Sequence, residues 1–102
     1  MAIYRLGLGS VSGTAKNNAV VVGTGFVATV ANCVLCNNSS GVVNVSVAVN
    51  DIVITSSKLS AGVGKSNIVF EAIGGLNAGD TLSFTGDGGA FNYYVAGKAD
   101  KT

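Results

Sequence analysis

The sequence contains no histidine, proline or tryptophan and has few charged residues. Without histidine the commonest general base is missing, and neither a Ser-His nor a Cys-His catalytic pair can form. The acidic residues are far apart in the sequence: Asp51, Glu71, Asp80, Asp87 and Asp100. Three of them (Asp51, Asp80 and Asp87) lie beside glycine or asparagine in turn-like segments, where aspartate commonly stabilises a turn. We therefore predict that the protein is not an enzyme.

Charged residues make up only 11% of the 102-residue chain, whereas typical soluble domains have about 25%. The net charge is +1. Nucleic-acid binding needs a basic face, but the basic residues are scattered along the chain: Arg5, Lys16, Lys58, Lys65, Lys98 and Lys101. We therefore predict no nucleic-acid partner. A surface with so little charge provides little electrostatic repulsion between molecules. The composition therefore favours a protein that works inside an assembly.

The length corresponds to one domain, residues 1–102. No run reaches the roughly 18 apolar residues that a membrane helix needs, so we predict no membrane partner. The first ten residues, MAIYRLGLGS, lack the apolar core of a signal peptide. We therefore expect expression in a cytoplasm, where thiols remain reduced.

Glycine occurs 15 times and separates short runs that are rich in valine, isoleucine, threonine and aromatic residues. Residues 42–49 alternate valine with smaller residues, as a half-buried strand does. Residues 68–73 are apolar on both faces, as expected where one side meets the core and the other a partner. We predict strands near 3–8, 15–22, 26–36, 42–49, 51–56, 67–73, 81–85 and 91–97. Short strands with frequent turns predict an all-β antiparallel β-sandwich or jelly-roll-like fold.

The pattern Gly23-x-Gly25-x-x-Ala28 follows an apolar run and resembles the glycine fingerprint of dinucleotide-binding domains, with Asp51 in the place of the ribose-binding acid. That fold needs a helix over about 26–37. The segment is rich in β-branched residues and has no amphipathic stripe, which disfavours a helix. We therefore interpret Gly23 and Gly25 as a turn between strands and predict no cofactor. A dinucleotide-binding domain stays a distant alternative.

The pair Cys33-x-x-Cys36 raises the question of a metal or redox site. A zinc site of this kind needs a second pair of cysteine or histidine ligands, and the chain has only these two cysteines and no histidine. Residues three apart in a strand also face opposite sides, too far apart for a disulfide. We predict that both cysteines are structural and that no metal binds.

Two segments carry a family resemblance. A strand ending in Cys36-Asn37 is followed by a small-residue turn and by the alternating strand 42–49, and a Leu-x-Ala-Gly-Asp-Thr-Leu segment at 76–82 precedes a final aromatic strand at 91–96. In this order, over most of residues 20–97, the chain resembles small structural proteins of tailed bacteriophages. The resemblance implies a β-sandwich virion component, on the capsid or in the tail, that acts by contact and has no active site.

On this basis we expect a capsid decoration or cement protein that is assembled into virions in the host cytoplasm. Its partners would be other copies of itself, most plausibly in a trimer, and the major capsid protein or other virion proteins. Tail, baseplate or fibre components and a host-receptor or carbohydrate-binding module are alternatives. The candidate contact residues are Tyr93, Tyr94, Val69 and Ile73, although aromatic residues in a strand usually pack in the core.

Overall fold

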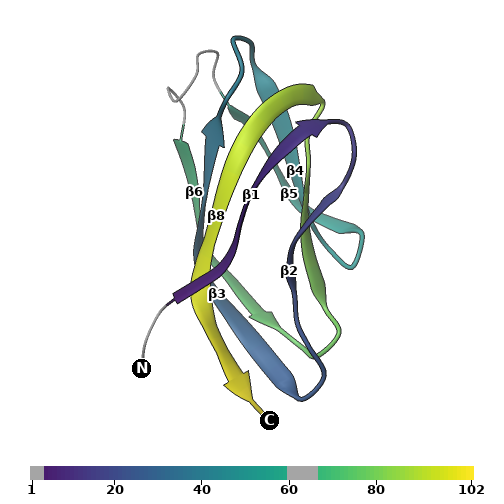
Figure 1. Cartoon of the computed structure of the whole chain (residues 1–102), viewed down its shortest axis with the longest axis vertical. Coiled ribbons are helices and arrows are strands. Elements are labelled where there is room, and N and C mark those ends of the chain that lie inside the picture. The colour runs from purple at the N-terminus through teal and green to yellow at the C-terminus, as the bar shows by residue number, and fades with distance from the viewer. Residues whose placement is uncertain (1–3, 60–66) are drawn as a thin grey trace.

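The computed structural model describes the backbone of residues 4–59 and 67–102 and the side chains of residues 5–59 and 75–102. This part of the chain forms eight strands and no helix, so it has no helical segment that could cross a membrane (Figure 1). The strands are β1 (Tyr4–Gly13), β2 (Asn17–Val21), β3 (Phe26–Asn37), β4 (Val43–Val49), β5 (Ile52–Leu59), β6 (Asn67–Leu76), β7 (Thr81–Thr85) and β8 (Gly88–Lys101).

The strands form two four-stranded antiparallel sheets. Sheet A has the order β1-β8-β3-β6, and sheet B has the order β2-β7-β4-β5. Each strand of the first half pairs with its counterpart from the second half: β1 with β8, β2 with β7, β3 with β6 and β4 with β5. The chain is thus one long hairpin wound into two layers, which is the winding of a jelly roll (Figure 1). The predicted eight-stranded antiparallel β-sandwich is confirmed.

The core lies between the two sheets and is built from alternate residues of their strands. On β4, the inward valines are almost completely buried: Val43, Val45 and Val47. The rings of Phe84 in sheet B and Tyr93 in sheet A meet with their centroids 5.0 Å apart. The alternation of residues 42–49 therefore predicted the buried face of β4 correctly.

The segment that a dinucleotide-binding fold would need as a helix is strand β3, which pairs with both β8 and β6. Gly25, just before it, has a φ of 85°, a left-handed conformation that glycine adopts without strain. The backbone N–H of Phe26 donates to the carbonyl of Gly23 at 3.2 Å and closes the turn. The structure contradicts the helix that a dinucleotide-binding fold would need over 26–37 and confirms the glycine turn.

The two cysteines lie on opposite faces of β3. Cys33 is buried in the core, whereas Cys36 is half-buried on the outer face of sheet A. Both are thiols. Their separation follows from the period of two along a strand, as the sequence predicted.

Asn37, the last residue of β3, is fully buried and organises the turn that leads into β4. Its Oδ1 accepts hydrogen bonds from the backbone N–H of Ser39 at 2.8 Å and from the Ser39 hydroxyl at 2.9 Å. Its Nδ2 donates to the carbonyls of Gly41 at 2.8 Å and Leu59 at 3.5 Å. Asparagine side chains commonly fix turns in this way. One buried side chain therefore positions the start of β4.

The first and last strands are longer than predicted. The glycine run at 86–89 favours a turn, yet Gly88 begins β8 and pairs with Gly13 at the end of β1. Near the other end of β8, Gly97 lies so close to the backbone of Thr29 that a Cβ atom would overlap its carbonyl oxygen. The hydrogen bonds between neighbouring strands join backbone groups and need no side chains. A glycine that is paired in this way can therefore be part of a strand.

Candidate functional site

The two tyrosines predicted to share a contact surface lie on opposite sides of sheet A. Tyr93 points into the core and is 6% exposed, and its hydroxyl donates to Oδ1 of Asn17 at 3.0 Å. Burial raises the pKa of the Tyr93 hydroxyl. Tyr94 points away from the core and is 40% exposed. Of the two tyrosines, Tyr93 is therefore used in core packing, as strand aromatics usually are, and Tyr94 is the accessible one. Their role in contacts stays a prediction.

The side chains of the other two predicted contact residues, Val69 and Ile73, lie outside the described residues. The backbone pairing of β6 is described, and it makes Val69 the register partner of Val34 on β3. Their role in contacts stays a prediction.

Tyr94 belongs to an apolar row on the outer face of sheet A. Its register partners are Leu8 on β1 and Val34 on β3. Directly paired residues project from the same face of a sheet and contact one another. Leu8 is 58% exposed, and Val34 is half-buried. We call Leu8, Val34 and Tyr94 the sheet-A patch.

Polar side chains border the sheet-A patch along the strands. In the adjacent row on one side, the hydroxyl of Ser10 donates to Oδ1 of Asn92 at 2.6 Å. In the row on the other side, Arg5 and Asn32 flank Ala96. An exposed apolar area with a polar rim is typical of a surface that binds a protein partner. Tyrosine is also enriched among the residues that contribute most to such binding.

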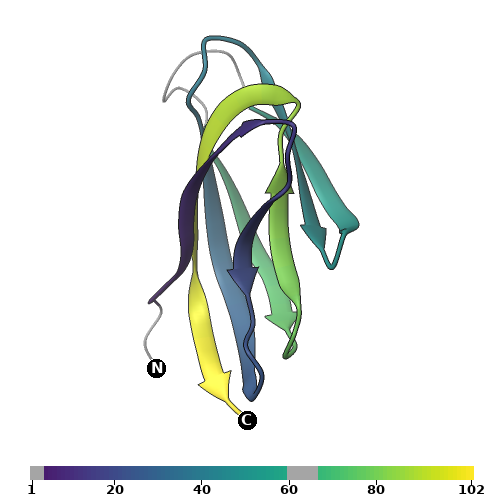
Figure 2. The ribbon, with the colours of Figure 1, turned by 45° about the vertical axis from the view of Figure 1, so that its right-hand side comes forward.

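A second exposed apolar group lies at the start of β5. β5 is one of the two edge strands of sheet B (Figure 2). Ile52, Val53 and Ile54 are 70%, 59% and 48% exposed. Because these residues are consecutive, both faces of the strand are apolar and accessible here. We call them the β5 tip. This group was not predicted from the sequence, although three successive apolar residues in a predicted strand indicate two apolar faces.

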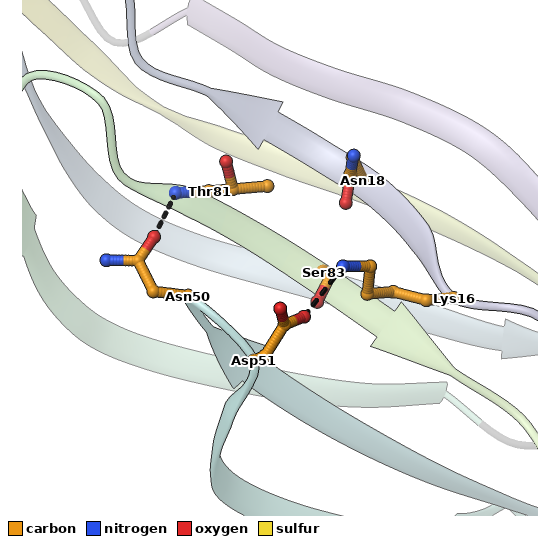
Figure 3. A pocket seen from close by; sticks show the side chains of 6 residues that line it. All are labelled: Lys16, Asn18, Asn50, Asp51, Thr81 and Ser83. Atoms are coloured by element: carbon orange, nitrogen blue, oxygen red, sulfur yellow. Dashed lines mark hydrogen bonds and ion pairs between the residues drawn. The ribbon is translucent and has the colours of Figure 1, made fainter.

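A polar depression of about 240 Å³ lies on sheet B beside the β4–β5 turn (Figure 3). Its lining residues come from β2, β7 and the segments next to β2 and β4: Lys16, Asn18, Asn50, Asp51, Thr81 and Ser83. Lys16 and Asp51 form an exposed ion pair at 2.7 Å across one side of it (Figure 3). This pair neutralises the two charges of the depression.

The remaining polar groups of the depression hold turns together. Oδ1 of Asn50 accepts from the backbone N–H of Thr81 at 3.0 Å, and its Nδ2 donates to Asp80 at 2.8 Å. Asp80 also accepts from the backbone N–H of Asn77 at 2.8 Å. The hydrogen bond from Asn50, followed by that from Asn77, lowers the pKa of Asp80. These groups join the end of β4 to the turn before β7. The polar side chains of the depression therefore have a structural role.

The described residues therefore gather accessible apolar side chains on two surfaces, the sheet-A patch and the β5 tip. Within residues 5–59 and 75–102, no three side chains of histidine, cysteine, aspartate or glutamate are grouped so that they could hold a metal ion. No protein-family model and no curated protein matches the sequence of this chain. Its function has to be inferred from these two surfaces.

Proposed function

We propose that this chain is a non-enzymatic structural protein of a tailed-phage virion and that it decorates or cements the capsid. The observation that carries the proposal is the sheet-A patch, an apolar row with a polar rim on a chain in which only 11% of the residues are charged. Covering such a surface favours association by roughly 25 cal/mol per Å² of apolar area, without any chemical step. The patch would face the major capsid protein or another virion protein.

The same contacts would serve a tail, baseplate or fibre component, and the resemblance to phage structural proteins covers both locations. A receptor- or carbohydrate-binding module is less well supported. Tyr94 has the aliphatic partners Leu8 and Val34 on either side. Sugar sites need hydrogen-bonding groups beside an aromatic ring, so these neighbours favour a protein partner.

The location is tested by mass spectrometry of purified virions and of separated capsids and tails. We expect the chain in the capsid fraction, in copy numbers comparable to those of the shell protein. Finding it only in the tail fraction would replace decoration by the tail alternative. Its absence from virions would contradict the whole proposal.

The contact surface is tested with two matched variants, Tyr94→Ser and Phe26→Ser, added to capsids that lack the protein. Tyr94 is 40% and Phe26 42% exposed, so each variant removes a similarly accessible aromatic ring. We expect Tyr94→Ser to weaken capsid binding by roughly tenfold or more, and Phe26→Ser to leave it nearly unchanged. Equal binding by both variants would contradict a role for the sheet-A patch.

A further inference from the structure

We propose that β5 pairs edge to edge with β5 of a second copy of this chain, antiparallel, across a two-fold axis between Ile54 and Thr55. The pairing would join the two B sheets into one continuous sheet. The inference deepens the proposed function by naming one surface through which copies associate. Only its use in a virion rests on that proposed function, because the pairing itself is a property of the purified protein.

The backbone of β5 has room for this partner. Within the described residues β5 pairs only with β4, so the other side of its backbone donors and acceptors faces no strand. An accessible apolar edge without charge is a template for another strand, and proteins usually protect such edges with lysine or proline. Residues 52–57 contain neither a charged residue nor proline. The edge is therefore open where the apolar side chains of the β5 tip are exposed.

Charge complementarity specifies a second copy of the chain and the register. The uncharged segment lies between Asp51, in the turn before β5, and Lys58, near the end of the strand. Antiparallel pairing about the proposed axis places Asp51 of each copy opposite Lys58 of the other. Asp51 keeps a side chain that is 73% exposed although it pairs with Lys16, and no ion pair of Lys58 with another described residue is found. Both charges are thus accessible to a partner.

A bulge in β5 also favours a second copy over an unrelated strand. Val47 pairs with Thr55 and Ala48 with Val53, so Ile54 has no partner on β4. Bulges increase the local twist of an edge and hinder its pairing with a regular strand. A second copy has the same twist at the same place, next to the two-fold axis. The contact is smaller than the roughly 1,600 Å² of standard stable interfaces, so we expect a weak dimer.

The first test is sedimentation velocity on the purified full chain, over a concentration series that reaches about 1 mM. The matched variants are Val53→Lys on β5 and Val21→Lys on β2, the opposite edge strand of sheet B. Val53 is 59% and Val21 65% exposed, so both variants place the same charge on a similarly accessible position. We expect wild type and Val21→Lys to form dimers reversibly, and Val53→Lys to remain monomeric throughout.

The second test addresses the register. Lys58→Glu alone places two acidic side chains together at both ends of the contact, and Asp51→Lys alone places two lysines together. Each variant should bind itself at least about tenfold more weakly than wild type does. An equimolar mixture should recover dimers, because the introduced lysine of one variant would then face the introduced glutamate of the other, and the unchanged Asp51 would face the unchanged Lys58. Circular dichroism checks that Asp51→Lys is folded, since that position has a φ of 66°.

Several outcomes would overturn the proposal: a monomer at every concentration, a trimer or open-ended growth instead of a dimer, equal loss of dimer in Val21→Lys and Val53→Lys, or no recovery in the mixture. A protein that is monomeric alone but binds capsids through β5 would also overturn it, because the occupant of the edge would then be another protein. That last result would leave the proposed virion function intact. A dimer that fails to bind capsids would support the pairing and contradict the capsid-decorating role.

Discussion

Strands β4 and β5 form one hairpin and have similar compositions, but they use their apolar residues differently. β4 has strand partners on both sides, and its inward valines are buried in the core. β5 has a described partner on one side only, and its first three residues are apolar and exposed. Position in the sheet therefore decides whether valine and isoleucine stabilise the fold or remain available for contacts.

The contrast between the two strands is tested most strongly by shortening one valine on each of them. Val47→Ala on β4 removes two fully buried methyl groups and should lower the free energy of unfolding by about 2–3 kcal/mol. Val53→Ala on β5 should change it by less than about 0.5 kcal/mol, because that side chain is exposed. Urea unfolding followed by circular dichroism measures both. Leu59, at the other end of β5, is buried in the core, so similar losses in the two variants would mean that the start of β5 is part of the core as well.

The second prediction concerns the turn that leads into the hairpin. Asn37→Ala should lower the free energy of unfolding by about 2 kcal/mol, because it leaves the backbone N–H of Ser39 and the carbonyl of Gly41 without their buried partner. Asn38→Ala is the control, since its side chain is exposed. We expect the control to unfold like the wild type in the same urea titration. A stable Asn37→Ala variant would show that the turn does not depend on this side chain.

The third prediction concerns the turn inside the hairpin, where Asn50 and Asp51 have φ values of 52° and 66°. Two-residue hairpin turns of this kind prefer glycine at the second position. Asp51→Gly should therefore raise the free energy of unfolding by roughly 0.5 kcal/mol, because the relief of backbone strain exceeds the loss of the exposed pair with Lys16.

Asn50→Gly provides the contrast for this turn. It relieves the same backbone conformation but removes the hydrogen bonds from Asn50 to Thr81 and Asp80, so it should lower stability. Thermal unfolding ranks the three proteins. A larger loss in Asp51→Gly than in Asn50→Gly would mean that the ion pair, rather than the amide of Asn50, holds the turn.

The smallest expected effect is a dependence of stability on pH. Asp80 binds Asn50 at one end of β4, and Asp87 binds the side chain and backbone of Asn44 at the other. These hydrogen bonds lower the pKa of both carboxyl groups from the usual 3.8. Their stabilising contribution is therefore present above about pH 4 and is lost as the pH falls through the lowered pKa values.

The melting temperature should accordingly decrease from pH 5 towards pH 2, and it should decrease less in the double variant Asp80→Asn and Asp87→Asn. Differential scanning calorimetry over this range measures both proteins. A melting temperature that rises on acidification would contradict the assignment of these two carboxylates.

Much of the fold could be predicted from the sequence because its strands alternate and its turns contain glycine and asparagine. The valines of β4 gave the buried face directly, and the β-branched residues of β3 excluded the helix of a dinucleotide-binding domain. The full length of β8 could not be predicted, because Gly88 remains in the strand only through its pairing with the distant Gly13. The order of the strands in the sheet brings these two residues together, and the residues around Gly88 do not determine that order.

The contact surfaces were harder to predict than the fold. The sequence selected both tyrosines of the final strand, but alternation sends Tyr93 inward and Tyr94 outward, and only the strand's orientation decides which one is accessible. Leu8 was missed because it joins Tyr94 only through the pairing of the first and last strands. The β5 tip was missed because the edge position of β5 depends on the order of the strands in sheet B.

The measurement that tests the account most directly is a density map of the intact virion at side-chain resolution. We predict an eight-stranded jelly roll on the capsid, with the sheet-A patch covered by shell protein and the β5 edge paired antiparallel with the β5 of another copy. A map in which the chain is present but both the sheet-A patch and the β5 edge face solvent would contradict the claim that these surfaces carry its function.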